Sequence, residues 1–195
     1  MIDFEGARNF IVQKLTNELR PELQYHNIEH TLDVLNSVDR LAILENENGH
    51  NLLLLKTAAL FHDSGMLIQY EDHEEASAII TRQYLPGFGY SEHDIQVINK
   101  MILTTKLPQS ASTKLEKILC DADLDYLGRD DFYMIAHRLQ YEWKKMKVFN
   151  TTLCEWYRLQ MNFLTNHYYY THSAISLRQE KKNIHLAEIK ELIKE

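Results

Sequence analysis

The sequence has few of the residues that form tight turns, with only 6 glycines and 3 prolines among its 195 residues. So few turn residues in a chain of this length argue for long helices. The length suits one domain with a sizeable hydrophobic core. Hydrophobic residues make up 45% and charged residues 25%, which is typical of a soluble globular protein.

Cysteine is also scarce, and Cys120 and Cys154 are the only two. Neither belongs to a C-x-x-C pair, which argues against a thiol-based metal or redox site. A cytosolic chain keeps such thiols reduced. We therefore expect both cysteines to be buried, small apolar side chains.

The sequence shows no feature that directs a chain to a membrane or to a nucleic-acid duplex. Residues 1–5 lack a basic and apolar leader, and no run approaches the ~20 apolar residues of a membrane span. The formal net charge of -7 disfavours binding to a duplex or to an anionic membrane. We expect a cytoplasmic protein, in which a small phosphorylated substrate could still bind through a metal and one or two cations.

Apolar residues recur at helical spacing along the chain, and no segment is a convincing strand. The spacing predicts an all-α, single-domain helical bundle over residues 1–195, with core motifs at about 22–140 and C-terminal helices over 150–195 packed on it. The most strand-like stretch, 168–171, has helical spacing on both sides, so we expect the helix to continue through it. The predicted helices are 3–19, 28–44, 52–62, 73–85, 92–105, 113–127, 130–149, 153–178 and 184–193.

The candidate chemistry begins where an apolar run, residues 52–61, ends in His62 and Asp63. Two adjacent ionisable groups at the mouth of a buried element are costly unless something satisfies them. A divalent metal would satisfy both, because imidazole and carboxylate are suitable ligands. Gly65 is read as the signal that stops the helix.

The same dipeptide recurs as His93-Asp94, which serves as an internal comparison. This second copy follows Ser91 in a polar segment, where Ser91 is a plausible N-cap. We expect His93 and Asp94 to lie in a solvated first helical turn, without a metal.

Further ligands can be sought at the ends and inward faces of other helices, since a bundle holds metals between facing helices. His26 and His30 are four residues apart and can face the same way if their helix starts early enough. Asp123 lies between apolar neighbours, where an aspartate is rare unless it is paired or metal-bound. Asp121 is the competing residue in that segment.

These residues resemble the HD superfamily of metal-dependent phosphohydrolases, whose pattern is a His, a His-Asp pair and a distant Asp in an all-helical bundle. The resemblance covers about residues 22–140. YHNIEHTLDV is similar to the entry motif of cyclic-nucleotide phosphodiesterases, while DADLDYLGRDDFY and FLTNHYYYTHSA resemble a subgroup of stand-alone predicted phosphohydrolases. The residues that match the metal ligands are His30, His62, Asp63 and Asp123.

The resemblance implies a phosphomonoesterase or phosphodiesterase that acts on a small phosphorylated substrate, with a nucleotide as the expected class, through metal-activated water. It implies catalytic roles for His26, as general acid, and for Asp63. The ligand set suits one divalent ion of Mn, Fe, Co, Ni, Zn or Mg and leaves a second ion open. His73 is a candidate for the substrate-binding or second-metal region. Lys106 stands where two-metal relatives carry another His, and it is also a candidate phosphate-binding cation in the substrate-binding region.

Three alternatives remain open at this stage. One is a non-hydrolysing, nucleotide-binding regulatory module of the same type. Another is a dinuclear-iron oxygenase on the same scaffold, against which the small supply of histidines counts. The last is a helical interaction protein whose His and Asp residues are incidental.

Overall fold

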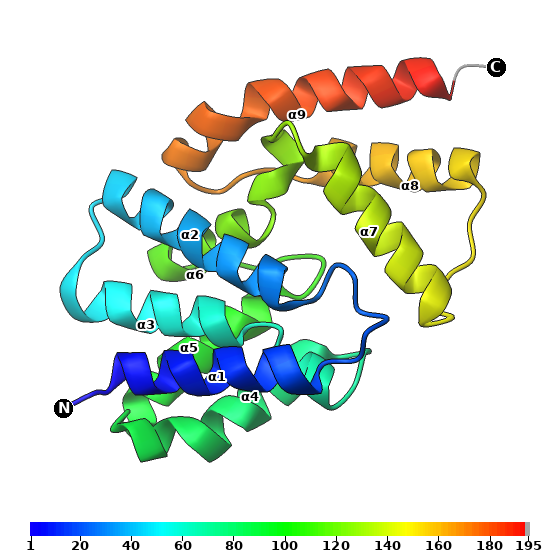
Figure 1. The fold of residues 1–195 in the computed structure, drawn as a ribbon. Coiled ribbons are helices and arrows are strands. Elements are labelled where there is room, and N and C mark those ends of the chain that lie inside the picture. The colour runs from blue at the N-terminus through cyan, green and yellow to red at the C-terminus, as the bar shows by residue number, and fades with distance from the viewer. Residues whose placement is uncertain (194–195) are drawn as a thin grey trace.

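The computed structural model describes residues 1–193, and in this range the chain forms α-helices and short 3-10 helices without any strand (Figure 1). The all-α, single-domain prediction is confirmed. The α-helices are α1 (Phe4–Glu18), α2 (Ile28–Leu44), α3 (Gly49–Phe61), α4 (His73–Tyr84), α5 (Glu92–Thr105), α6 (Lys114–Asp123), α7 (Phe132–Lys145), α8 (Leu153–Asn166) and α9 (His172–Leu192), and the 3-10 helices are η1 (Ser64–Leu67), η2 (Leu85–Phe88) and η3 (Asp125–Gly128).

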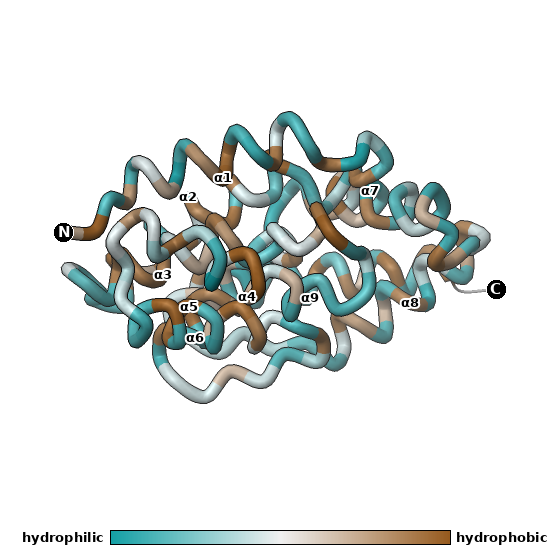
Figure 2. Tube along the Cα trace, turned by 90° about the horizontal axis from the view of Figure 1, so that it is seen from below, coloured by the Kyte–Doolittle hydropathy of each residue, from teal (hydrophilic) through white to brown (hydrophobic). Residues whose placement is uncertain are grey.

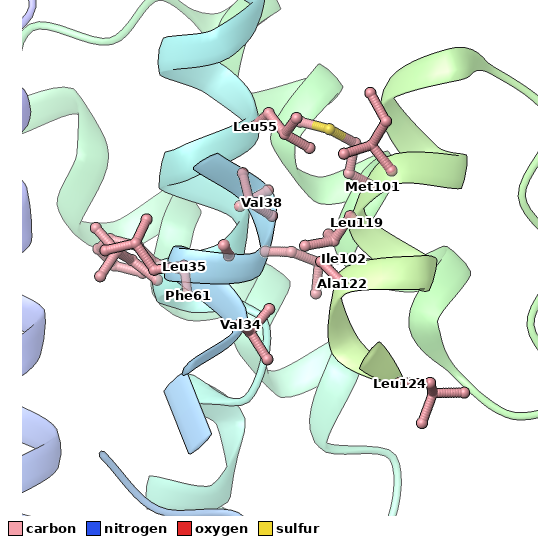
Figure 3. Close-up of a cluster of buried hydrophobic side chains, with 14 of the residues drawn as sticks. Val34, Leu35, Val38, Leu55, Phe61, Met101, Ile102, Leu119, Ala122 and Leu124 are labelled. Carbon is pink, nitrogen blue, oxygen red and sulfur yellow. The ribbon is translucent and has the colours of Figure 1, made fainter. Parts of the chain in front are cut away.

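The apolar helix α3 lies at the centre and contacts α1, α2, α5 and α6. Its sequence is apolar on nearly every side, as a helix that is packed on several sides requires. Leu55 from α3 meets Met101 from α5, and Val38 from α2 and Leu119 from α6 belong to the same buried cluster (Figure 3). Figure 2 shows the contrasting pattern of α1, where hydrophobic and hydrophilic residues alternate along the helix.

Side-chain caps explain why several helices begin where they do. Asp3 accepts a hydrogen bond from the Gly6 backbone N–H at 2.8 Å, and Asn27 accepts one from that of His30 at 3.1 Å. Ser91 and Asp94 form a reciprocal capping box at the start of α5. The predicted cap Ser91 is therefore confirmed, Asp3 caps α1, and Asn27 sets the start of the helix that carries His30.

The structure corrects the predicted boundaries in the second half of the chain. The predicted helix 113–127 ends at Asp123 and continues as η3. The predicted helix 130–149 begins at Phe132, after the N-cap Asp131, and ends at Lys145. The predicted helix 153–178 is interrupted over 167–171, and its second part joins the predicted 184–193 helix to form α9.

A tertiary contact accounts for the interruption between α8 and α9. The buried carboxylate of Asp121 accepts hydrogen bonds from the Tyr170 N–H at 2.8 Å and from the Thr171 N–H and hydroxyl at 2.7 Å each. The Thr171 side chain in turn caps α9. These bonds satisfy backbone groups that a continuous helix would have paired internally, so periodicity alone could not reveal the break.

Two further observations bear on the predictions. Cys120 is buried as expected, but Cys154 is exposed on α8, so that expectation is wrong for Cys154. Among residues 1–193, no helix combines the length and the apolar character that crossing a bilayer requires.

Candidate metal centre

The four predicted metal ligands all lie at helix ends. His30 is in the first turn of α2, His62 directly follows α3, Asp63 precedes η1, and Asp123 is the last residue of α6. These ends meet because α2, α3 and α6 pack on one another through the apolar residues between them. The packing of the core thus brings the ionisable groups together, because these groups lie where the apolar stripes of the helices end.

The side chains of these residues converge on one point. The Nε2 atoms of His30 and His62 are 3.3 Å apart. Asp123 Oδ1 lies 3.2 Å from His30 Nε2 and 3.5 Å from His62 Nε2. Asp63 Oδ2 lies 3.4 Å and 3.2 Å from the same two nitrogens. One ligand atom each from His30, His62 and Asp123 falls within a mutual distance of 4.8 Å, which suits one ion.

Two observations support the fit of a divalent cation to this donor set. The His62 Nδ1 atom donates a hydrogen bond to the Ala59 carbonyl at 2.8 Å, which leaves Nε2 as the ligand atom that faces the centre. Asp63 Oδ2 is buried and has no hydrogen-bond partner among the described residues. A buried carboxylate oxygen without a donor calls for a positive charge.

The protein's own charges partly compensate one another in the centre. Burial by itself lowers the pKa of His30, but the nearby carboxylates of Asp123 and Asp63 prevail and raise the pKa to about 9. Burial raises the pKa of Asp123, but His30 and His62 prevail and lower it to about 2. The two carboxylates therefore attract positive charge to this point, and a cation that displaces the imidazole protons would meet the same attraction.

Gly65 contributes through its lack of a side chain. A Cβ atom at this position would overlap the His73 carbonyl oxygen and would lie 2.6 Å from the Ser77 backbone nitrogen. Ser77 Oγ accepts from the Gly65 N–H at 2.7 Å and donates to the His62 carbonyl at 2.6 Å. The interpretation of Gly65 as a helix stop is wrong, because α3 ends before it and the glycine instead permits η1 to pack closely on α4.

This close packing brings His73 to the centre. His73 Nε2 lies 3.3 Å from Asp63 Oδ1, and its Nδ1 donates to the Tyr70 carbonyl at 3.1 Å. Glu74 Oε1 lies 3.6 Å from the same Nε2 atom. Burial lowers the pKa of His73, but the hydrogen bond to Asp63 prevails and raises it to about 8. His73 thus holds the Asp63 oxygen that faces away from His30 and His62.

His26 lies beside the centre but outside its ligand set. Its ring is 6.3 Å from the His30 ring and 5.3 Å from the His73 ring, centroid to centroid. Its Nδ1 donates to Glu142 Oε1 at 2.5 Å, which leaves Nε2 toward the cavity that His26 lines. His26 thus lies beside the predicted ligands, and its role as proton donor stays a prediction.

Glu142, which the sequence did not single out, holds His26 in this position. Its fully buried carboxylate also accepts from the N–H groups of Tyr25 and His26, at 2.8 and 3.0 Å, and from the Tyr70 hydroxyl at 2.8 Å. Burial raises the pKa of Glu142, but the bond to His26 prevails and lowers it. The only sequence signal was a glutamate in an otherwise amphipathic helix, 116 residues from its partner.

A cavity of about 470 Å³ opens beside these groups. Its polar lining residues include Asp63, Asp123, His26, His73 and Lys106. The Lys106 ammonium donates to Asp72 Oδ1 and Glu75 Oε1 at 2.6 Å each. The cavity thus connects the candidate metal ligands with a space that suits a small molecule.

His93 and Asp94, the second copy of the dipeptide, lie outside the candidate metal centre. His93 is exposed as expected, but Asp94 is buried, caps α5 and lies 2.7 Å from His50 Nε2, so the expectation of a solvated Asp94 is wrong. Asp121, the competitor of Asp123, faces the start of α9 rather than the centre.

A family model for the HD domain matches residues 27–125, which is 99 of the 195 residues. The protein therefore belongs to the HD domain family, in agreement with the resemblance in its motifs. The match spans all four converging ligands and ends at the start of η3. The finer assignment to a subgroup with the YHNIEHTLDV motif stays a prediction.

Relatives support the fold over a larger part of the chain. The crystal structure of a predicted HD superfamily hydrolase from an uncultured Thermotogales bacterium has a TM-score of 0.62 at 20% identity and covers 97% of this chain and 90% of that one. A Lactobacillus plantarum structure has a TM-score of 0.69 at 18% identity, covering 98% and 97%. An uncharacterized Clostridium beijerinckii protein is 37% identical over 81 residues, which is 40% of this chain and about half (51%) of that relative.

Proposed function

We propose that this protein is a metal-dependent phosphohydrolase that cleaves a phosphomonoester or phosphodiester of a small molecule, with a nucleotide as the leading substrate class. The observation that carries the proposal is the convergence of two imidazole nitrogens and two carboxylate oxygens beside a histidine that lines the same cavity. Membership of the HD domain family supports the same conclusion.

In this proposal His30, His62, Asp63 and Asp123 hold one divalent cation. Such an ion would supply a Lewis acid, which lowers the pKa of water toward ~7 and offsets charge on a phosphoryl group. The His73 hydrogen bond to Asp63 Oδ1 orients that carboxylate, so that Asp63 can accept a hydrogen bond from the attacking water.

His26 would donate the proton that the leaving group needs. The water oxygen forms a new bond to phosphorus while the bond to the ester oxygen breaks, and that oxygen takes the proton from His26 Nε2. General acid catalysis of this kind contributes typically about 10²–10⁴-fold. The Glu142 carboxylate accepts a hydrogen bond from Nδ1, which orients the ring so that Nε2 can reach a leaving group in the cavity.

The first test concerns the cation. Elemental analysis of purified protein should find a divalent metal, and adding that metal to stripped protein should raise the melting temperature. Asp63→Asn should lose both effects, whereas Asp94→Asn should keep them, because this second buried aspartate after a histidine lies outside the centre. Metal-free protein whose melting is insensitive to divalent cations would contradict the proposal and favour an interaction protein.

The second test concerns the proton donor and uses two similar substrates. Phenyl phosphate has a leaving group with a pKa of about 10, so it needs a proton, whereas p-nitrophenyl phosphate releases a far weaker base. His26→Gln should lose about 10²–10⁴-fold in kcat on phenyl phosphate and much less on p-nitrophenyl phosphate. His93→Gln, at an exposed site, should match the wild type. Metal binding without turnover of any phosphoester would favour a regulatory module instead.

A further inference from the structure

The cavity beside the metal centre carries an excess of negative charge beyond the candidate ligands. Glu71, Asp72 and Glu74 also line it. Lys106 is the only lysine among its lining residues within the described part of the chain, and no arginine is among them. Sites that hold several phosphates need several cationic donors, so this composition is unusual for a polyphosphate site.

The single lysine is already engaged. Two carboxylates, those of Asp72 and Glu75, each lie 2.6 Å from its ammonium group. This trio has a net charge of −1, so Lys106 cannot offset an added phosphate without leaving its partners. Cations on the other side of His30 are also paired: Arg138 with Glu29 at 2.8 Å, and Arg129 with both Asp33 and Asp131.

The cavity also has an apolar wall, which comes largely from α7, α8 and the segments next to them. Three of its residues are partly open to solvent at the rim, with exposed fractions of 57% for Leu107, 39% for Leu159 and 38% for Val148. Aromatic and apolar side chains form the remainder, among them Met66, Leu139, Trp143 and Phe163. Such a wall suits a flat or apolar organic group.

Building on the proposed phosphohydrolase function, we propose that the cavity selects esters with a single phosphoryl group on an aromatic or apolar organic group and rejects nucleoside di- and triphosphates. The one phosphoryl group would face His26 and His73, while the organic group lies along the wall of Trp143 and Phe163. Each further phosphate would lie among carboxylates without a free cation. We expect a loss of about tenfold per added phosphate, from like charges within the cavity.

The test uses one nucleoside at three phosphate lengths. AMP, ADP and ATP are compared with 1-naphthyl phosphate at a fixed concentration of free divalent cation, because ADP and ATP bind the cation themselves. Turnover (kcat/KM) and binding are measured in parallel, with binding read from tryptophan fluorescence. Trp143→Phe identifies the signal, since Trp156 is fully buried and does not line the cavity.

We expect 1-naphthyl phosphate and AMP to bind most tightly and ATP to bind about 10²-fold more weakly than AMP. Equal or tighter binding of ATP overturns the proposal. A preference for glycerol phosphate over 1-naphthyl phosphate also overturns the proposal, since that result would show that the apolar wall does not contribute to substrate binding.

A charge-release variant tests the cause directly. Asp72→Asn with Glu75→Gln frees Lys106, so the ratio of ATP to AMP affinity should rise about tenfold. The matched control is Glu5→Gln with Glu18→Gln, which removes two exposed carboxylates that pair with cations on α1. The control should leave the ratio and the activity unchanged, and a similar rise in the control would show that only net charge matters.

The two proposals fail in different ways. If no phosphoester is hydrolysed, the proposed function is wrong, and the fluorescence series still decides the selectivity of the cavity. If ATP is hydrolysed as well as AMP, the proposed function stands and the single-phosphoryl selectivity is wrong.

Discussion

Glu142→Gln is the sharpest probe of how the fold prepares His26 for proton transfer. The wild-type carboxylate accepts two backbone N–H groups at Oε2, and it accepts His26 Nδ1 and the Tyr70 hydroxyl at Oε1. An amide has only one acceptor oxygen, and the backbone N–H groups of Tyr25 and His26 cannot reverse their role. The amide oxygen must therefore face the backbone, which turns the NH₂ group toward His26 and Tyr70.

This change acts on both stability and catalysis. Hydrogen bonds to charged groups contribute about 1.5–3 kcal/mol each, and two of the four are lost or reversed. We expect a loss of about 3 kcal/mol in the free energy of unfolding, a decrease of about 6–12 °C in Tm. An NH₂ group cannot accept the hydrogen bond that Nδ1 donates, so the ring loses the contact that orients Nε2, and kcat on phenyl phosphate should fall about 10²-fold, with a smaller decrease on p-nitrophenyl phosphate.

The control for this experiment is Glu116→Gln. Glu116 is another buried glutamate that accepts backbone N–H groups, from Ser112 at 2.7 Å and Thr113 at 2.9 Å, but it lies at the start of α6. It should lose stability without any difference between the two substrates. Equal losses on both substrates in Glu142→Gln would show that Glu142 only supports the fold, and unchanged turnover of phenyl phosphate would refute the reasoning altogether.

Two further predictions concern stability, measured by chemical denaturation. Gly65→Ala should lower the free energy of unfolding by about 3 kcal/mol or more, because the new Cβ atom would overlap backbone atoms. The control Gly87→Ala places its Cβ atom in open space and should change the free energy of unfolding by less than about 1 kcal/mol. Equal effects of the two substitutions would refute the close-packing argument. Burial, assisted by the Lys182 charge, lowers the pKa of His167 to about 3. Because the unfolded chain then binds a proton first, stability should decrease as the pH falls from about 6.5 toward 3, by roughly 1–2 kcal/mol at pH 5. His167→Phe should remove this part of the decrease, and an unchanged pH dependence would contradict the assignment.

Much of the helical framework could be predicted from local patterns. The helices 28–44 and 92–105 were predicted with the observed boundaries, because each has a polar cap and a clear apolar face. The break at 167–171 could not be predicted, since it depends on Asp121, which lies about 50 residues earlier. Helical periodicity continues across the break, because the apolar faces of two separate helices can give the same spacing as one continuous helix.

The candidate centre likewise combines features that could be predicted from the sequence with features that depend on the tertiary structure. Residue type, apolar context and the resemblance to the HD superfamily together singled out His30, His62, Asp63 and Asp123, and the structure places their ligand atoms together. It also separates Asp123 from Asp121 and His62-Asp63 from His93-Asp94, choices that depend on which way each side chain points from its helix.

The sequence by itself determined that the chain forms a helical bundle and which ionisable residues stand where its apolar stripes end, because both follow from local spacing and the cost of burying charge. Only the tertiary structure decided that Glu142 holds His26, that Gly65 brings His73 to Asp63, and that Lys106 is occupied by Asp72 and Glu75. These contacts join residues from different helices, and the packing of those helices, which no local pattern records, sets their distances.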